Sequence, residues 1–517
     1  MLNIESYPDL LFYTENNMNN LNPDVIEDLN IKECLSFFLN KNEVINIINI
    51  ISTLCNKENI IARQEVALLC RNKNFYNIFS ELYDIIRDLS IGFNNYSINS
   101  DNLQNQLNFI NIIKKYLSFL DKIENISEVK NSVLISKFYE YFNNQRLSQK
   151  FIEMKTNLNE IVNELSNISE ISIDILTFKA FFNNFLLTTP KKPSLYNILI
   201  EINNKISNNK LVEKQTIKKE LFFDCIEKFP ELYPELFIKI NDFCSEYSDC
   251  INEDILKYIN QISFYLSMNE IYNKISEKNF ALCLPEFSEK NIDIYSLFDL
   301  NLLAKNDIKI ICNDINFNHN EGFYVLTGAN GGGKTTFIRG IGICAVLFMS
   351  GCYIPAANAQ MKILDNIFTH FTKDERFDDI GRLKDETQRI EMILNKVNEN
   401  SLVLLNETFS STKQSIAIEL SVKYIKKFIK KGIFGMFVTH QHDIADNIEN
   451  INNTQNSIKI INIVADIGTD QNSRTYKIVK NKTDKKSYSE DILEKYGLSK
   501  HQLSQRLYLN KNGEQHD

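Results

Sequence analysis

A glycine-rich run carries the clearest chemical signal in the chain. It reads Gly328-Ala-Asn-Gly-Gly-Gly-Lys-Thr335, follows the strand-like segment Phe323–Leu326 and precedes a helix-like segment that begins near Thr336. Glycines allow consecutive backbone N–H groups to turn towards phosphate oxygens, the lysine can neutralise the phosphate charge, and the threonine hydroxyl can bind Mg²⁺. The run therefore predicts a binding site for the phosphates of a nucleotide.

The strand-loop-helix setting of the run distinguishes this prediction from a chance glycine-rich turn. A bare match to the spacing G-x-x-x-x-G-K-[ST] also occurs in turns that bind nothing. Here the following helix would direct the positive end of its dipole at the same anion. The residues predicted to contact ATP are Gly328, Asn330, Gly331, Gly332, Gly333, Lys334, Thr335 and Thr336.

A second apolar segment ends in groups suited to ATP hydrolysis, which needs acidic groups near the metal ion and the attacking water. The segment Ser401–Leu405 is followed by Asn406 and Glu407. Glu407 is predicted to orient or deprotonate the water. Asn406 is predicted to support Mg²⁺ through water, together with Thr335. Because a neutral amide contributes less to Mg²⁺ binding than a carboxylate, weak metal binding or slow turnover is expected.

A histidine follows a third strand-like segment. The segment Phe434–Val438 is followed by Thr439 and His440. A histidine just beyond a strand end can contact the γ-phosphate or its water, and so distinguish ATP from ADP. The predicted catalytic pair is therefore Glu407 and His440.

Length and charge limit the possible classes of protein. A chain of 517 residues exceeds what one hydrophobic core usually serves, so two or more domains are expected. The formal net charge of −9 argues against a general nucleic-acid packaging protein, whose surface would be positive.

The cysteines, histidines and apolar segments indicate a cytoplasmic protein with neither a structural metal nor a membrane span. The ten cysteines form no C-x-x-C pair and the six histidines show no metal-ligand spacing. The segment Met1–Asp24 has no secretory signal, and the most apolar window, Ile341–Ala357, is too short to span a membrane.

Two kinds of hydrophobic periodicity divide the chain. From Ile31 to Lys278, apolar residues recur at three- and four-residue steps, which indicates helices. After Asn279, short apolar runs alternate with helix-like segments, which indicates a mainly parallel sheet wrapped by helices. The expected strands are 308–311, 323–326, 402–405, 434–438 and 458–464, and the expected helices are 336–349, 384–397 and 413–430.

Five short motifs occur in an order and spacing that one protein family shares. They are Thr327–Thr336, Gly351–Ala356, Ile367–Thr369, Asn406–Thr412 and Thr439–His440. These motifs resemble those of the MutS mismatch-repair ATPases, a branch of the ABC-type ATPases. The segment Lys486–Leu498 resembles the helix that closes the family's ATPase domain. The similarity covers about residues 281–509 and, more weakly, about residues 31–280, which include Ile61-Ala-Arg63.

The resemblance implies an α/β ABC-type P-loop ATPase domain preceded by a mainly α-helical domain. The expected domains are 1–280, a shortened helical core or lever, and 281–517, the ATPase domain with a C-terminal helical dimerisation segment. ATP and Mg²⁺ are the implied cofactors, and a second copy of the chain and DNA are the implied partners. Residues 1–280 leave no room for the family's mismatch-reader and connector domains, so branched or distorted DNA is expected rather than mispaired bases.

The resemblance also implies that each bound nucleotide is completed by residues of the partner subunit. The family's signature loop usually offers a serine there, whereas the corresponding segment Asp379–Glu386 has none. The residues expected to make contacts across the dimer are Gly381, Arg382, Lys384, Ser410, Ser411 and Thr412.

Two other functions fit part of the pattern. Asn406 and the missing signature serine would also suit a nucleotide-gated scaffold with negligible ATP turnover. The motor subunit of a transporter fits the ABC-type elements, but the chain lacks the Leu-Ser-Gly-Gly-Gln-type signature and has a long helical lead-in. We therefore expect a homodimeric ATPase with ATP-gated DNA binding, and the gated scaffold remains the alternative.

Overall fold

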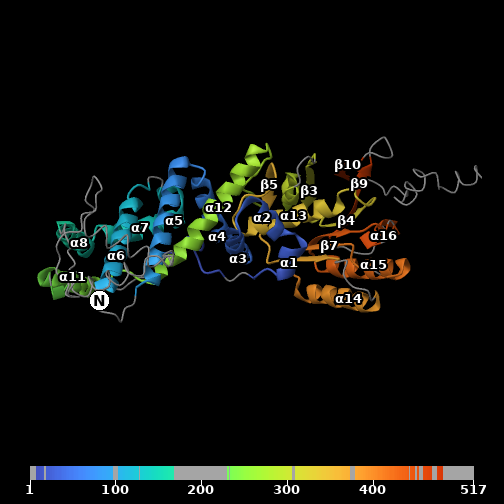
Figure 1. Ribbon diagram of the computed structural model, residues 1–517. Helices are drawn as coiled ribbons and strands as arrows, with labels where there is room; N and C mark the ends of the chain where they lie inside the picture. The colour runs from blue at the N-terminus through green and yellow to red at the C-terminus, as the bar shows by residue number, and fades with distance from the viewer. Residues whose placement is uncertain are drawn as a thin grey trace, which may run out of the picture. The chain divides into compact units, whose positions relative to one another are not determined.

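The computed structural model describes most of the chain. The described residues are 7–16, 19–96, 103–126, 129–167, 230–231, 233–304, 309–372, 379–410, 412–441, 443–446, 448, 451–452, 458–467 and 474–480. The chain forms two compact units, one made of Met1–Tyr13 and Leu68–Leu266, the other of Thr14–Ala67 and Ser267–Asp517. Figure 1 labels most of their helices and strands.

The first unit is helical in its described residues. Its central helix, α6, is buried over most of its surface because α5, α7, α8 and α11 all pack against it, while Lys114, Ser118 and Asp121 form an exposed stripe. Rings of Tyr7, Phe119, Phe138, Phe142 and Tyr258 fill part of the core in edge-to-face and stacked contacts. The helices of this unit are α5 (Lys73–Asn94), α6 (Leu103–Ile123), α7 (Val133–Arg146), α8 (Gln149–Asn167), α11 (Pro234–Tyr247) and the first part of α12 (Lys257–Glu277).

The second unit contains a six-stranded sheet in the order β10-β9-β4-β8-β7-β6, in which only the β10–β9 pair is antiparallel. Strands β4, β7 and β8 are buried at every residue, as expected where helices cover both faces of a parallel sheet. The strands are β4 (Phe323–Thr327), β6 (Asn366–Phe371), β7 (Ser401–Asn406), β8 (Phe434–Val438), β9 (Ile460–Ile467) and β10 (Arg474–Val479).

A four-stranded sheet in the order β1-β5-β2-β3 completes the second unit. Its strands are β1 (Glu286–Phe287), β2 (Ile292–Leu297), β3 (Asn313–Phe317) and β5 (Asn358–Met361). The described helices of the unit are α1 (Pro23–Asp28), α2 (Ile31–Phe38), α3 (Lys41–Ile51), most of α4 (Lys57–Leu69), the second part of α12, α13 (Lys334–Met349), α14 (Asp379–Lys396), α15 (Gln414–Lys430) and α16 (Asp443–Asp446).

The strand predicted at 308–311 is wrong. Residues 309–312 have no regular structure, and β3 begins at Asn313. In β3, Asn313, Ile315 and Phe317 are buried and alternate with more exposed residues, and Ile315 and Phe317 pair with β2. Strand formation here follows this alternation and the cross-strand pairing, rather than the short apolar run that precedes β3.

The two units do not follow the single boundary after residue 280 that the sequence predicted. Residues 14–67 belong to the unit that contains the sheets, because α1 packs on β6 and α3 packs on α13. The buried carboxylate of Asp28, on α1, accepts hydrogen bonds from Thr369 Oγ1 (2.7 Å), from the Phe371 backbone N–H (3.3 Å) and from Arg389 Nη2 (3.0 Å). Burial raises the pKa of Asp28, against the opposing effects of these partners.

Two segments identified separately in the sequence meet at the C-terminal end of α13. The fully buried Arg63, on α4, donates from Nη1 to the Ser350 carbonyl at 3.2 Å, where a cation complements the helix dipole. Gly351 has φ +73°, and a Cβ there would lie 2.6 Å from Arg63 Cβ. The close approach therefore requires glycine at position 351.

Within the described ranges, none of the helices combines the length and the apolar character needed to cross a bilayer. The same ranges contain no cluster of three or more histidine, cysteine or acidic residues able to hold a metal ion.

Candidate functional site

The glycine-rich loop connects the end of β4, at Thr327, to the start of α13, at Lys334. Gly328 has φ +130°, and a Cβ there would lie 3.1 to 3.3 Å from Ala465 atoms on β9. Gly333 caps α13 with φ +87°, in the left-handed region that disfavours residues with side chains. Glycine is therefore required at both ends of the loop.

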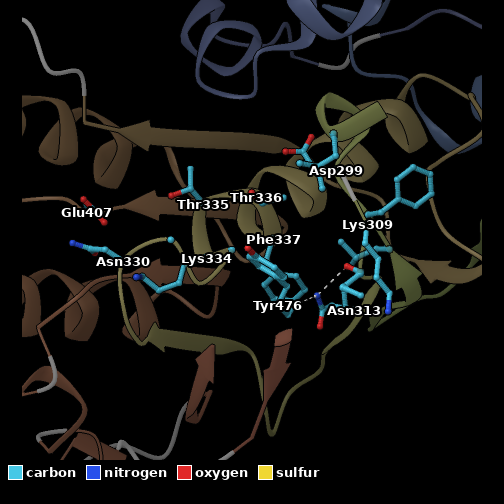
Figure 2. Close-up of a pocket in the computed structure, with 16 residues that line it drawn as sticks. Asp299, Lys309, Asn313, Asn330, Lys334, Thr335, Thr336, Phe337, Glu407 and Tyr476 are labelled. Carbon is cyan, nitrogen blue, oxygen red and sulfur yellow. Dashed lines mark hydrogen bonds between the residues drawn. The ribbon is translucent and has the colours of Figure 1, made fainter. Parts of the chain in front are cut away.

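Lys334 lies inside this loop. Its side chain is 5% exposed, and Nζ donates to the carbonyl oxygens of Gly328 (2.8 Å) and Ala329 (3.0 Å). Burial lowers the pKa of Lys334, and the Glu407 carboxylate opposes this shift. Figure 2 shows Lys334, Asn330 and Glu407 on the same side of the loop. An anion bound in the loop would stabilise the buried ammonium group.

Thr335 and Asn406, the two predicted metal-supporting residues, are in contact. Thr335 Oγ1 donates to Asn406 Oδ1 at 3.4 Å, and Asn406 is buried at the end of β7. A hydroxyl, an amide carbonyl and the nearby Glu407 carboxylate are oxygen ligands of the kind that Mg²⁺ prefers, directly or through water. The residues present therefore fit a Mg²⁺ ion.

Glu407 follows β7 directly, and its backbone N–H donates to the Val438 carbonyl at 2.8 Å. Its Oε1 lies 3.9 Å from His440 Nδ1, which is longer than a hydrogen bond, and the His440 side chain is 45% exposed. The pKa of Glu407 is lowered, first by His440 and further by Lys334, although burial opposes the shift. Glu407 is therefore ionised at neutral pH and can accept a hydrogen bond from water.

A cavity of about 320 Å³ adjoins the loop. Seven predicted residues line it, while Gly328, Gly332, Asn406 and His440 do not. The predicted residues in its lining are Asn330, Gly331, Gly333, Lys334, Thr335, Thr336 and Glu407.

The opposite wall of the cavity comes from residues that the sequence analysis missed. Phe337 lies on the first turn of α13, and the others belong to β2, β3, β10 and the segments beside them, so no local motif links these others to the loop. Figure 2 labels Asp299, Lys309, Asn313, Phe337 and Tyr476 among them. Asn313 Nδ2 donates to the Tyr476 carbonyl at 3.0 Å, and the Ile478 N–H donates to Asn313 Oδ1 at 2.8 Å, which joins β3 to β10. These lining residues are Leu297, Phe298, Asp299, Leu302, Lys309, Ile311, Asn313, Phe337 and Tyr476.

Three of the residues predicted to contact a partner subunit, Lys384, Ser410 and Thr412, have side chains that the structure describes. Lys384, in α14, is exposed, and neither it nor Ser410 nor Thr412 lines the cavity. Gly381 and Arg382 lie in the first turn of α14, where the structure describes only the backbone of these two residues. Ser411 and the segment 486–498 lie outside the described residues.

Comparison with known proteins identifies the domain that carries the site. Residues 324–506 match the family model described as MutS domain V. The DNA mismatch repair protein MutS of Clostridioides difficile (strain 630) is 24% identical over 467 residues, which are 81% of this chain and 46% of that protein. The MutS of Prochlorococcus marinus (strain AS9601) is 33% identical over 198 residues, 38% of this chain and 21% of that protein.

This chain also matches only part of a eukaryotic relative. The DNA mismatch repair protein MSH2 of Saccharomyces cerevisiae is 24% identical over 266 residues, which are 48% of this chain and 28% of that protein. The chain thus spans less than half the length of each of these three relatives. The domain V match begins within β4 and continues past β10, so it includes the glycine-rich loop and the strand ends that carry Glu407 and His440. This part of the chain, residues 324–506, therefore belongs to the domain V family of MutS proteins.

Proposed function

We propose that this protein binds and hydrolyses ATP as a homodimer and that ATP controls its binding to DNA. The observation that best supports ATP binding is the buried Lys334 ammonium, held inside a glycine-rich loop beside a cavity of about 320 Å³. In this proposal Lys334 binds the β- and γ-phosphates, and the cavity wall that includes Phe298 and Tyr476 accepts the nucleoside.

The residues beyond the phosphates would carry out hydrolysis. Mg²⁺ held by Thr335 and, through water, Asn406 would neutralise charge on the phosphates. Glu407, ionised at neutral pH, would orient the attacking water. The exposed His440, 3.9 Å from Glu407, would contact the γ-phosphate or this water. It would therefore respond when the γ-phosphate is lost. In the dimer, the start of α14 and the loop 410–412 of each subunit would complete the partner's nucleotide site.

We propose DNA as the ligand whose binding changes when ATP is bound and hydrolysed. The relatives are DNA mismatch repair proteins, and we propose DNA as the ligand of this chain, with branched or distorted DNA as its preferred form. Helices α4 and α12 each contribute residues to both compact units, so they would carry movement from one unit to the other. Such a protein would act in the cytoplasm.

DNA binding is expected to weaken steeply with salt, because lysine and arginine contacts to phosphates release counterions. The measurement is the dissociation constant for a four-way junction and for a linear duplex of the same length, across a series of salt concentrations with and without ATP. We expect tighter binding to the junction and a negative slope of log affinity against log salt. No binding to either DNA at the lowest salt concentration would contradict the DNA proposal and leave the ATPase proposal standing.

Replacing Asn406 by aspartate is expected to change the ATP turnover rate by less than about threefold, because the remaining Mg²⁺ contacts come from phosphate oxygens, Thr335 and water. Steady-state hydrolysis at saturating Mg²⁺ measures this. Asn395→Asp, the same chemical change at an exposed position of α14, is the matched control. A gain of about tenfold or more in Asn406→Asp, from a wild type with negligible turnover, would instead favour the nucleotide-gated scaffold.

A further inference from the structure

A buried carboxylate on α14 contacts the loop that carries Glu407. Glu386 is 6% exposed, and its Oε2 accepts a hydrogen bond of 2.9 Å from the backbone N–H of Phe409. Burying an ionised carboxylate costs several kcal/mol unless strong hydrogen bonds compensate for the lost hydration. An exposed glutamate keeps its hydration and does not incur this cost. The burial of Glu386 therefore needs a functional explanation.

The loop that Glu386 contacts has an unfavourable backbone conformation. Glu407 has φ +54° and Phe409 has φ +66°, both in the left-handed region that residues with side chains disfavour by about 1 to 2 kcal/mol each. Such conformations persist only where the surrounding structure holds them. Hydrogen bonds hold the backbone at both positions: the Glu407 N–H donates to the Val438 carbonyl (2.8 Å), and the Phe409 N–H donates to Glu386.

Side-chain contacts hold the same loop to its surroundings. Thr408 Oγ1 is in hydrogen-bond contact with His370 Nδ1 at 3.1 Å, and burial lowers the pKa of His370 to about 3, so this ring is neutral. The Phe409 ring stacks on Tyr424 of α15, with ring centroids 5.6 Å apart. Tyr424 in turn donates from its hydroxyl to Glu391 Oε1 at 2.8 Å, which is a second connection to α14.

We propose that Glu386 is a positioning residue that holds Glu407 in its hydrolytic orientation by fixing the Phe409 amide to α14. The proposal rests on the ATPase function proposed above. α14 begins at Asp379, so Gly381, Arg382 and Lys384, the residues of this helix expected to contact the partner's nucleotide, precede Glu386 on the same helix. A change at that end of α14 would therefore reach the Phe409 amide through this hydrogen bond, and Glu407 of the same subunit through the backbone that joins it to Phe409.

The most informative variant is Glu386→Met, which keeps the length and volume of the side chain but removes the acceptor oxygens. We expect its kcat for ATP hydrolysis to fall by about tenfold to a hundredfold, because small displacements of a catalytic group have effects of this size. Its dissociation constant for ATP should stay within about threefold of wild type, because the glycine-rich loop is untouched. Glu386→Gln retains an acceptor oxygen and should restore kcat to within about threefold of wild type.

A double variant distinguishes positioning from a general structural role. If Glu386 acts through Glu407, Glu386→Met should lower the residual rate of Glu407→Gln by less than about twofold. Independent effects would multiply, and that result would overturn the proposal. Full activity of Glu386→Met, or a parallel loss of ATP affinity and turnover, would also overturn it. Glu419→Met, at an exposed glutamate of α15, is the control for substitution by methionine.

Amide hydrogen exchange of the wild-type protein tests the same proposal without any substitution. The Phe409 amide should exchange at least about a hundredfold more slowly than an unprotected amide, because its hydrogen bond is buried. Exchange at the unprotected rate would overturn the positioning role even if Glu386→Met did not fold. A wild type that shows no ATP hydrolysis would refute the proposed function, whereas the exchange rate would still decide whether Glu386 holds this loop.

Discussion

Glu407→Gln is expected to hydrolyse ATP at least about a hundredfold more slowly than wild type while binding ATP with nearly unchanged affinity. Glutamine has the size of glutamate but cannot take a proton or supply the negative charge that orients water. The neighbours of Glu407 lower its pKa, so wild type carries this charge at neutral pH and keeps it until the pH falls below the ordinary glutamate range. Single-turnover hydrolysis and equilibrium binding of ATP separate the two effects.

A matched control for this substitution is Glu419→Gln, at an exposed position of α15, which should leave both quantities unchanged. Hydrolysis by Glu407→Gln at the wild-type rate would assign the reaction to another group. A parallel loss of ATP binding would show that Glu407 contributes to the binding of ATP rather than to its hydrolysis.

Lys334→Ala is expected to weaken ATP binding by about a hundredfold. The Lys334 ammonium is the charged donor enclosed by the loop, and charge-assisted hydrogen bonds of this kind contribute about 1.5 to 3 kcal/mol, or roughly tenfold to more than a hundredfold in affinity. Titration calorimetry with ATP gives the dissociation constant. Lys426→Ala, at an exposed position of α15, should bind as wild type does.

The same substitution is expected to leave the melting temperature of the nucleotide-free protein nearly unchanged. Burial lowers the pKa of Lys334, so the free protein holds the charged ammonium at a cost that its two carbonyl contacts offset. Thermal unfolding of both proteins without ATP tests this expectation. Unchanged ATP affinity in a folded Lys334→Ala protein would contradict the assignment of the loop as the phosphate site.

The sequence predicts the residues proposed to bind phosphate and to hydrolyse ATP, because glycine spacing and strand-end residues are local features. The loop between β4 and α13, and the positions of Asn406 after an apolar strand and of His440 after the next, can all be predicted from a few consecutive residues. The predicted MutS resemblance is confirmed by the domain V match over residues 324–506. The roles of these residues in binding and hydrolysis remain predictions.

The wall of the cavity opposite the glycine-rich loop is formed by contacts between segments that are distant in the sequence, so the sequence does not predict it. Phe298 and Tyr476 line one cavity with Lys334 although 178 residues separate them (476 − 298), and no short pattern records such an approach. Glu386 gives no signal in the sequence either, because a glutamate in a polar helical segment is indistinguishable from a solvated one. Its burial and its hydrogen bond to Phe409 become evident only in the folded structure.

The division into compact units also depends on long-range contacts. Helical periodicity assigned residues 31–278 to one domain, since α2 and α3 have the same kind of amphipathic pattern as α5 and α6. Three hydrogen bonds to the Asp28 carboxylate join α1 to β6 and α14. Their donors lie more than 300 residues away from Asp28 in the chain. A periodicity argument detects an apolar face but does not identify the surface that covers it.

Small-angle scattering of Glu407→Gln, with and without ATP and Mg²⁺, tests most directly whether two copies of this chain close around ATP. The account predicts the mass of two chains at millimolar ATP and a smaller radius of gyration than in the nucleotide-free sample. The mass of a single chain at millimolar ATP would contradict it. Identical scattering curves in the two samples would contradict it equally.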